Sequence, residues 1–223
     1  MADRVWRGPG HGAGLIARAS AAWVGLTALL CLGAVAAGAV DPTTIDWQPA
    51  RAFSEPWRAF SAVAVHYSGL HLAANLSGGA VVAALGVAAR VPWRCVWAWL
   101  AAWPLTQFGL LLQPQLTHYG GLSGVLHAAV AVVAVQLVID ARGARRAIGA
   151  ALLLGLIAKV LTESPWGEPL RHPPGWDIAV APLAHATGLV AGAACALVAA
   201  LVAALLTPLL PARPRLDHPP PRP

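Results

Sequence analysis

The sequence has few charged residues and few of the residues that bind metals or form disulfides. Only 11% of its 223 residues are charged, and it has three cysteines and one methionine. A soluble domain has roughly 25% charged residues. Cys31, Cys95 and Cys195 each lie in apolar sequence without a CxxC spacing, so we interpret them as small buried side chains. No HExxH motif occurs, which argues against a zinc metalloprotease. We therefore expect no metal and no cofactor.

Apolar residues, in contrast, are abundant and organised in blocks. They make up 58% of the chain, and Cys95 to Ile139 is a run of 45 residues without Asp, Glu, Lys or Arg. A membrane-spanning helix needs roughly 20 apolar residues. The blocks are apolar on all sides, whereas a soluble helix would keep a polar face. We predict six spans, at about 20–40, 61–88, 94–112, 122–139, 147–162 and 179–207.

These blocks predict an all-α polytopic membrane protein, a six-transmembrane-helix bundle in a single domain. Residues 20–207 would form the membrane domain and residues 1–19 a cytoplasmic segment. Residues 208–223, "PLLPARPRLDHPPPRP", are rich in proline and arginine and are expected to be a disordered cytoplasmic tail.

The distribution of arginine predicts the orientation. With a cytoplasmic N-terminus, eleven of the fifteen basic residues lie inside, three lie outside, and Lys159 lies within the fifth span. This agrees with the positive-inside rule. The net charge of +6 is thus explained by membrane topology, and we expect a lipid bilayer and no nucleic acid as the partner. Both termini would be cytoplasmic.

The second predicted span carries polar residues that a bilayer disfavours. His71 and Asn75 are four residues apart and share one helical face, while His66 lies five residues before His71. Strongly polar groups inside a membrane span indicate function by default. By the predicted topology, the second span begins outside, so these residues lie in the outer half of the bilayer.

Two further spans begin on the same side with polar residues. The fourth opens with "GGLSGVLH", which places Ser123 between glycines and His127 on the same helical face. The sixth reads "APLAHATGLVAG", with His185 near its outer end. Gly188 and Gly192 form a small-xxx-small pair that allows another helix to approach closely. A nucleophile, a base and hydrogen-bond donors from three helices therefore converge at one depth, as acyl transfer requires.

Three segments together resemble the rhomboid intramembrane serine proteases. They are "EPWRAFSAVAVHYSGLHLAANL", "GGLSGVLH" and "AHATGLVAG", in that order along the chain. The shared features are the Trp57-Arg58 pair, an HxxxxHxxxN run, a GxSG motif at 121–124 and an AHxxGxxxG motif at 184–192. GxSG alone is a weak signal, whereas three motifs on three spans are a specific one.

The resemblance implies a Ser-His dyad without an acidic third member. Ser123 would be the nucleophile and His185 the base. The oxyanion hole would consist of Asn75, His71 and the backbone N–H of Ser123. Supporting roles are implied for the glycines and the remaining histidines of the motifs, namely His66, His127, Gly121, Gly124 and Gly188. Gly188 would let the sixth helix approach closely enough for His185 to reach Ser123.

One departure points to a particular branch. Most rhomboids carry a tyrosine four residues after the serine, where this chain has His127. A histidine there resembles the rhombosortases, which are associated with bacterial proteins that carry a C-terminal GlyGly-CTERM sorting tail. The implied partner is a transmembrane protein substrate with a Gly-Gly-containing anchor. The implied location is the bacterial inner membrane, with the active site towards the periplasmic side.

Other interpretations stay open from the sequence alone. The chain could be a catalytically inactive rhomboid-like binding or quality-control protein, or a haem protein with histidine ligands from separate helices. His66 is expected to hold the outer loop, and His127 either packs on His185 or acts directly. Trp57 and Arg58 are expected to be structural, and Lys159 to extend towards an interface.

Overall fold

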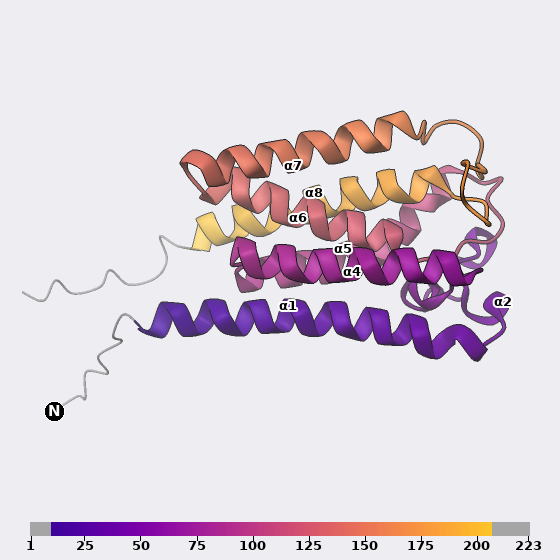
Figure 1. Ribbon diagram of the computed structural model, residues 1–223, viewed down its shortest axis with the longest axis horizontal. Coiled ribbons are helices and arrows are strands. Elements are labelled where there is room, and N and C mark those ends of the chain that lie inside the picture. Colours follow the sequence, from indigo (N-terminus) through magenta and orange to yellow (C-terminus); the bar gives the residue numbers. More distant parts are fainter. Residues whose placement is uncertain (1–9, 207–223) are drawn as a thin grey trace, which may run out of the picture.

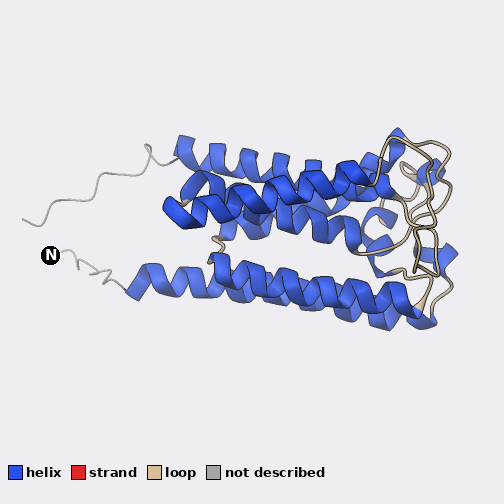
Figure 2. Ribbon diagram, turned by 45° about the horizontal axis from the view of Figure 1, so that its top comes forward, coloured by secondary structure: helices blue, strands red, loops and turns tan. Residues whose placement is uncertain are grey.

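The computed structural model describes residues 10–206, and these residues form an all-helical bundle without a β-strand (Figures 1 and 2). The predicted fold class is thereby confirmed. Within the described part, the long helices are α1 (Gly10–Ala36), α4 (Gly69–Ala89), α5 (Trp93–Phe108), α6 (Ser123–Asp140), α7 (Gly143–Thr162) and α8 (Pro182–Leu206). Short elements connect them: η1 (Ala37–Ala39), α2 (Pro42–Ile45), η2 (Pro49–Arg51), α3 (Arg58–Ser61), η3 (Ala62–Ala64) and η4 (Gly109–Leu112). The predicted tail at 208–223 lies outside the described residues.

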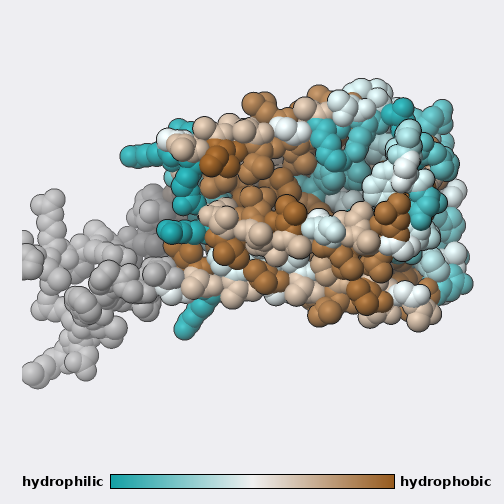
Figure 3. Space-filling view, viewed as in Figure 1, coloured by the Kyte–Doolittle hydropathy of each residue, from teal (hydrophilic) through white to brown (hydrophobic). Residues whose placement is uncertain are grey.

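Five of the described helices are long and apolar enough to cross a membrane. They are α1 with η1, α4, α5 with η4, α6 and α8. The fifth predicted span corresponds to α7, which has 20 residues but carries three basic ones, Arg145, Arg146 and Lys159, and is not among these five. Figure 3 shows a broad apolar band across the face in view, with hydrophilic residues at its two ends, as expected of a protein that spans a bilayer.

Some boundaries differ from those predicted. α1 begins at Gly10 rather than near residue 20. α4 begins only at Gly69, eight residues after the predicted start, because Ser68 caps it by accepting a hydrogen bond from the His71 N–H at 3.1 Å. The apolar residues before Ser68 belong instead to α3, η3 and a bend. Hydropathy alone cannot separate these short elements from the helix that follows them.

α6 is the central helix of the bundle, with neighbours on most of its sides. Its buried residues include Val125, Val132 and Val133, each fully buried. The Trp99 indole of α5 donates to the Val125 carbonyl at 2.9 Å, which satisfies an N–H that would otherwise be unpaired in an apolar core. The Trp23 ring of α1 packs on Trp99 with ring centroids 4.5 Å apart. α1, α5 and α6 are thereby joined at one level.

α6 and α8 touch through small residues. A Cβ on Gly188 would overlap the Gly124 carbonyl, and one on Gly192 would overlap the Ala128 carbonyl. Backbone contact at successive turns is possible only because these positions lack side chains. The N-terminal ends of α6 and α8 therefore lie together. They meet at the end of the bundle that also holds α2 and the connecting loops (Figure 1).

Candidate active site

The segment before α6 is fixed in an unusual backbone conformation. Gly121 has φ of 140°, a region that favours glycine. Its N–H donates to the Ala62 carbonyl at 3.0 Å, and a Cβ there would lie 3.0 Å from both Cε1 and Nε2 of His71. Glycine therefore permits the chain to turn into α6 directly against the His71 ring. Ser123 is the first residue of that helix.

Ser123 and His185 form a hydrogen-bonded pair. The Oγ of Ser123 lies 2.9 Å from Nε2 of His185, which is in the first turn of α8 and 7% exposed. The pairing follows from the close approach of α6 and α8, because Gly124 and Gly188 are each within three residues of the pair. A Cβ on Gly124 would lie 2.7 Å from the Ala184 carbonyl oxygen, so this position has no room for a side chain.

The other ring nitrogen of His185 contacts a carboxylate. Nδ1 lies 2.6 Å from Oε2 of Glu163, the residue that follows α7, and Oε1 of Glu163 lies 2.6 Å from Nζ of Lys159. The resemblance to rhomboids did not predict an acidic group here. The Lys159–Glu163 spacing of four residues was the available signal, because it forms a helical ion pair at the end of an apolar segment. Lys159 was expected to extend towards the membrane interface, but its ammonium group contacts Glu163 at this site.

The ring of His127 stacks on the ring of His185. Its ring centroid lies 4.2 Å from that of His185, with an angle of 11° between the ring planes. Its Nδ1 lies 2.7 Å from the Ser123 carbonyl oxygen, which can only accept, so Nδ1 carries the hydrogen. The ring is thus held parallel to His185 by a hydrogen bond one helical turn back.

The polar residues of the second span form a group beside Ser123. His66 has Nδ1 3.2 Å from the Ala64 carbonyl and Nε2 3.1 Å from Nδ2 of Asn75. Nδ1 therefore donates and Nε2 accepts from the amide, which orients Asn75. The rings of His66 and His71 are 4.7 Å apart. His71 is buried, and its Nδ1 has no hydrogen-bond partner among the described residues.

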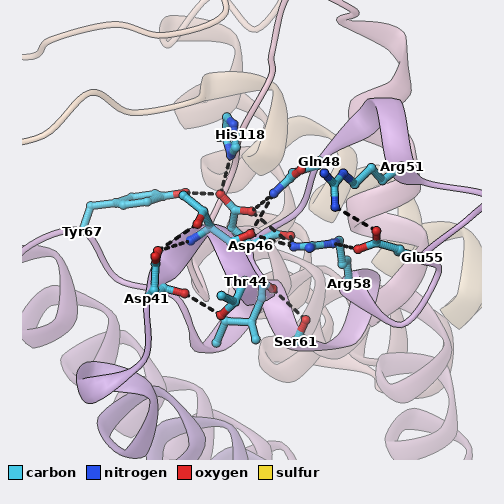
Figure 4. A network of polar contacts seen from close by, with 12 residues as sticks. Asp41, Thr44, Asp46, Gln48, Arg51, Glu55, Arg58, Ser61, Tyr67 and His118 are labelled. Atoms are coloured by element: carbon cyan, nitrogen blue, oxygen red, sulfur yellow. Dashed lines mark hydrogen bonds and ion pairs between the residues drawn. The ribbon is translucent and has the colours of Figure 1, made fainter.

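A network of polar contacts is centred on Asp46 and includes His118 (Figure 4). Asp46 and Arg58 are both buried, and Nη1 of Arg58 donates to the Asp46 carbonyl oxygen at 2.9 Å. The Asp46 carboxylate also binds Gln48 at 2.8 Å and Nδ1 of His118 at 2.7 Å. His118 belongs to the segment that leads into Gly121. Arg58 is therefore structural, as expected, while Asp46 and the contact of His118 were not anticipated.

Ser123, His185 and the side chains around them line one cavity of about 710 Å³. Its walls come from α4, α6 and α7 and from residues 173–181 before α8. Its polar lining includes His71, Asn75, Ser123, His127, Lys159, Glu163 and His185, together with Tyr67, His118 and Tyr119. Its apolar lining includes Val82, Leu126, Val130 and Leu156. In Figure 3, hydrophilic residues extend from the loop end into the apolar band.

The arrangement supplies the elements of nucleophilic acyl transfer. A hydroxyl is hydrogen-bonded to an imidazole, an amide and a second imidazole lie nearby, and apolar walls limit access of water. Within residues 10–206, no group of three or more His, Cys, Asp or Glu side chains is arranged to hold a metal ion. The structure thus brings together all the predicted site residues, with His66 reaching the group through Asn75.

A family model described as "Rhomboid domain" matches residues 54–202. The matched segment contains each predicted site residue and also Glu163. A search of curated proteins found no match.

Proposed function

The chain belongs to the rhomboid family, and from this premise we propose that it is an active intramembrane serine protease that cuts membrane-anchored proteins. The observation that carries the proposal is the 2.9 Å contact between Ser123 Oγ and His185 Nε2 inside a largely apolar cavity. Inactive relatives of such enzymes have no need to keep both groups in hydrogen-bonding geometry.

In the proposed reaction, the Ser123 oxygen attacks the carbonyl carbon of the scissile peptide bond. The new C–O bond forms as the hydroxyl proton moves to Nε2 of His185, and the carbonyl π electrons move onto its oxygen. The tetrahedral intermediate then collapses: the C–N bond breaks and His185 gives the proton to the leaving nitrogen. Water, activated by the same histidine, hydrolyses the acyl-enzyme and restores the serine.

The developing oxyanion requires hydrogen-bond donors in a site with little water. Asn75, His71 and the backbone N–H of Ser123 are the proposed donors. The contact of the His71 ring with Gly121 supports this assignment, because it holds an imidazole against the chain next to the nucleophile. The hydrogen bond from Asn75 to His66 supports it as well, since it uses one amide hydrogen and leaves the other for the cavity.

We further propose that the substrate carries a C-terminal Gly-Gly-containing anchor, as the resemblance of His127 to the rhombosortase pattern implies. A peptide bond inside a helix is protected by its own hydrogen bonds, and each glycine lowers helix stability by about 1 kcal/mol relative to alanine. A Gly-Gly pair at the outer end of an apolar helix can therefore unwind and enter the site. The proposed location is the bacterial inner membrane, with the loop end of the bundle facing the periplasm.

The catalytic proposal is tested with a fluorophosphonate probe. The purified protein in lipid vesicles is incubated with the probe, digested, and the adduct located by mass spectrometry. We expect one adduct, on Ser123, and no adduct when the protein is heat-denatured before the probe is added. Labelling of another serine, or of none in a folded sample, would favour the inactive rhomboid-like relative.

The substrate proposal is tested separately in cells. A protein with a GlyGly-CTERM tail is co-expressed with the wild type or with Ser123→Ala, and its C-terminus is determined by mass spectrometry. We expect truncation next to the glycines with the wild type alone. If the tail remains in both strains while an ordinary rhomboid substrate is cut, the sorting role is wrong and the protease function remains.

A further inference from the structure

Glu163, His185 and Ser123 form a continuous chain of hydrogen bonds. Oε2 of Glu163 lies 2.6 Å from Nδ1 of His185, whose Nε2 lies 2.9 Å from Ser123 Oγ. A carboxylate, an imidazole and a hydroxyl in this order are the three parts of a serine-hydrolase triad. The family resemblance implies only the last two, so the role of Glu163 comes from the geometry of this chain.

The neighbours of His185 determine which ring nitrogen carries the hydrogen. Nδ1 faces the Glu163 carboxylate, which only accepts, so Nδ1 is the donor. Nζ of Lys159 lies 3.5 Å from the same nitrogen, but an ammonium group only donates and cannot satisfy an N–H. Nε2 is consequently left with a lone pair directed at the Ser123 hydroxyl. This is the tautomer that a general base requires.

The backbone and two basic residues fix the position of Glu163. α7 ends at Thr162 and Glu163 is its C-cap; the following residue, Ser164, has φ of 51° in the left-handed region, which turns the chain away from the helix. Nη1 of Arg171 donates to the Glu163 carbonyl oxygen at 2.8 Å. Lys159 binds Oε1 at 2.6 Å, which leaves Oε2 for His185. Both carboxylate oxygens are thus assigned to partners.

We propose that Glu163 is a positioning residue that completes a Ser123–His185–Glu163 triad, with Lys159 orienting its carboxylate. This inference rests on the proposed protease function. In the proposed reaction, the Ser123 proton moves to Nε2 of His185 while the Nδ1 hydrogen stays in place. Glu163 stabilises the resulting imidazolium and does not take up the proton.

The protonation of Glu163 agrees with this role. Burial by itself would raise the pKa of the carboxyl, but the hydrogen bond and charge of His185, together with those of Lys159, hold the pKa well below its usual range. The carboxylate is therefore charged throughout the pH range in which a histidine base operates.

Among the described residues, four charged or titratable groups contact His185 or act on it electrostatically. They are His127 on α6, His71 on α4, Lys159 on α7 and Glu163 after α7. Only Glu163 contributes a negative charge in direct contact. In Glu163→Gln, the imidazolium that forms during the reaction would lose its neighbouring negative charge, and the amide could donate to Nδ1 and favour the wrong tautomer. In Lys159→Met, the loss of a positive charge acts in the opposite direction.

The test measures the rate of fluorophosphonate labelling of Ser123 as a function of pH, with the full chain in lipid vesicles. The probe is small, so its rate reports activation of the serine rather than entry of a substrate helix into the cavity. For Glu163→Gln, we expect a maximal rate reduced on the order of 10²- to 10⁴-fold and an acidic limb moved to lower pH. Lys159→Met should move the acidic limb to higher pH, and Glu163→Asp should recover part of the rate.

Glu168→Gln is the matched control. It makes the same acid-to-amide change in the same loop, at an exposed residue outside the catalytic cavity, and should not alter the profile. Wild-type rate and an unshifted limb in Glu163→Gln would overturn the triad and leave the protease function intact. Equal losses in Glu163→Gln and Glu163→Asp with an unshifted limb would overturn it too, because they indicate a purely structural role. Absence of labelling in the wild type would overturn the proposed function and the triad together.

Discussion

Gly188 on α8 faces Gly124 on α6 so closely that a methyl group on Gly188 would overlap the Gly124 carbonyl. The contact is next to the two residues that carry the proposed chemistry: Ser123 directly precedes Gly124, and His185 lies three residues before Gly188. The separation of the two helices therefore decides whether the serine and the histidine meet.

We predict that Gly188→Ala forces the two helices apart. Overpacking of this kind costs roughly 1–3 kcal/mol, and a displacement of about 1 Å at the reacting groups can reduce activity on the order of 10²-fold. Thermal unfolding in detergent and substrate cleavage would measure the two effects. Gly33→Ala on α1 is the control, because no atom lies within 4 Å of its added Cβ. Equal behaviour of the two variants would contradict the proposed role of the contact.

We predict that Ser123→Ala and His185→Ala each abolish cleavage and remain folded. Removal of one member of a catalytic unit typically removes nearly all activity, because the members act together. Ser77→Ala is the control: its hydroxyl binds the Ala73 carbonyl within α4 and faces outward. Cleavage assays and thermal unfolding should be run on the same samples. Substantial turnover by folded Ser123→Ala would rule out the proposed nucleophile.

We predict a smaller loss for Asn75→Ala. Loss of a single oxyanion donor reduces kcat on the order of 10²-fold, and the effect on KM should be minor because the donor acts mainly in the transition state. Steady-state kinetics with a cleavable transmembrane peptide would separate the two constants. A change in KM alone would instead assign Asn75 to substrate binding.

We predict that the loop end of the bundle lies outside the cell membrane. Single cysteines at Phe53 and Trp166, which are 85% and 72% exposed, should react in whole cells with a maleimide that does not cross membranes. A cysteine at the exposed Ala144, in the first turn of α7, should react only after permeabilisation. The native cysteines would first be replaced by alanine. The opposite labelling pattern would invert the proposed orientation and place Ser123 near the cytoplasm.

We predict that acidification removes a stabilising contribution of Glu163. The folded-state pKa of the carboxyl lies below the unfolded value near 4.5. Its contribution is therefore complete above the unfolded pKa and is lost as the pH falls through the folded value. The midpoint of thermal unfolding should be higher for wild type than for Glu163→Gln at neutral pH, and the difference should shrink towards about pH 3. A constant difference would mean that the carboxylate does not form its charged contacts.

The sequence by itself determined the helical membrane class, the six long helices and the end of the bundle at which the polar residues gather. These properties follow from local composition, because a bilayer requires about 20 apolar residues for each span and arginine sets its direction. The occurrence of the three motifs together in one chain was also sufficient to identify the family, as the match over residues 54–202 shows.

Only the tertiary structure decided which residues of the connecting loops meet. Glu163 follows α7 and reaches His185, 22 residues later, while Asp46 reaches His118, 72 residues later. Such contacts depend on the path of each loop, which leaves no periodic pattern in the sequence, whereas the spacing of Gly188 and Gly192 did predict a close approach of α8 to another helix. The start of α4 was likewise set by the hydrogen bond from the His71 N–H to Ser68, which hydropathy cannot detect.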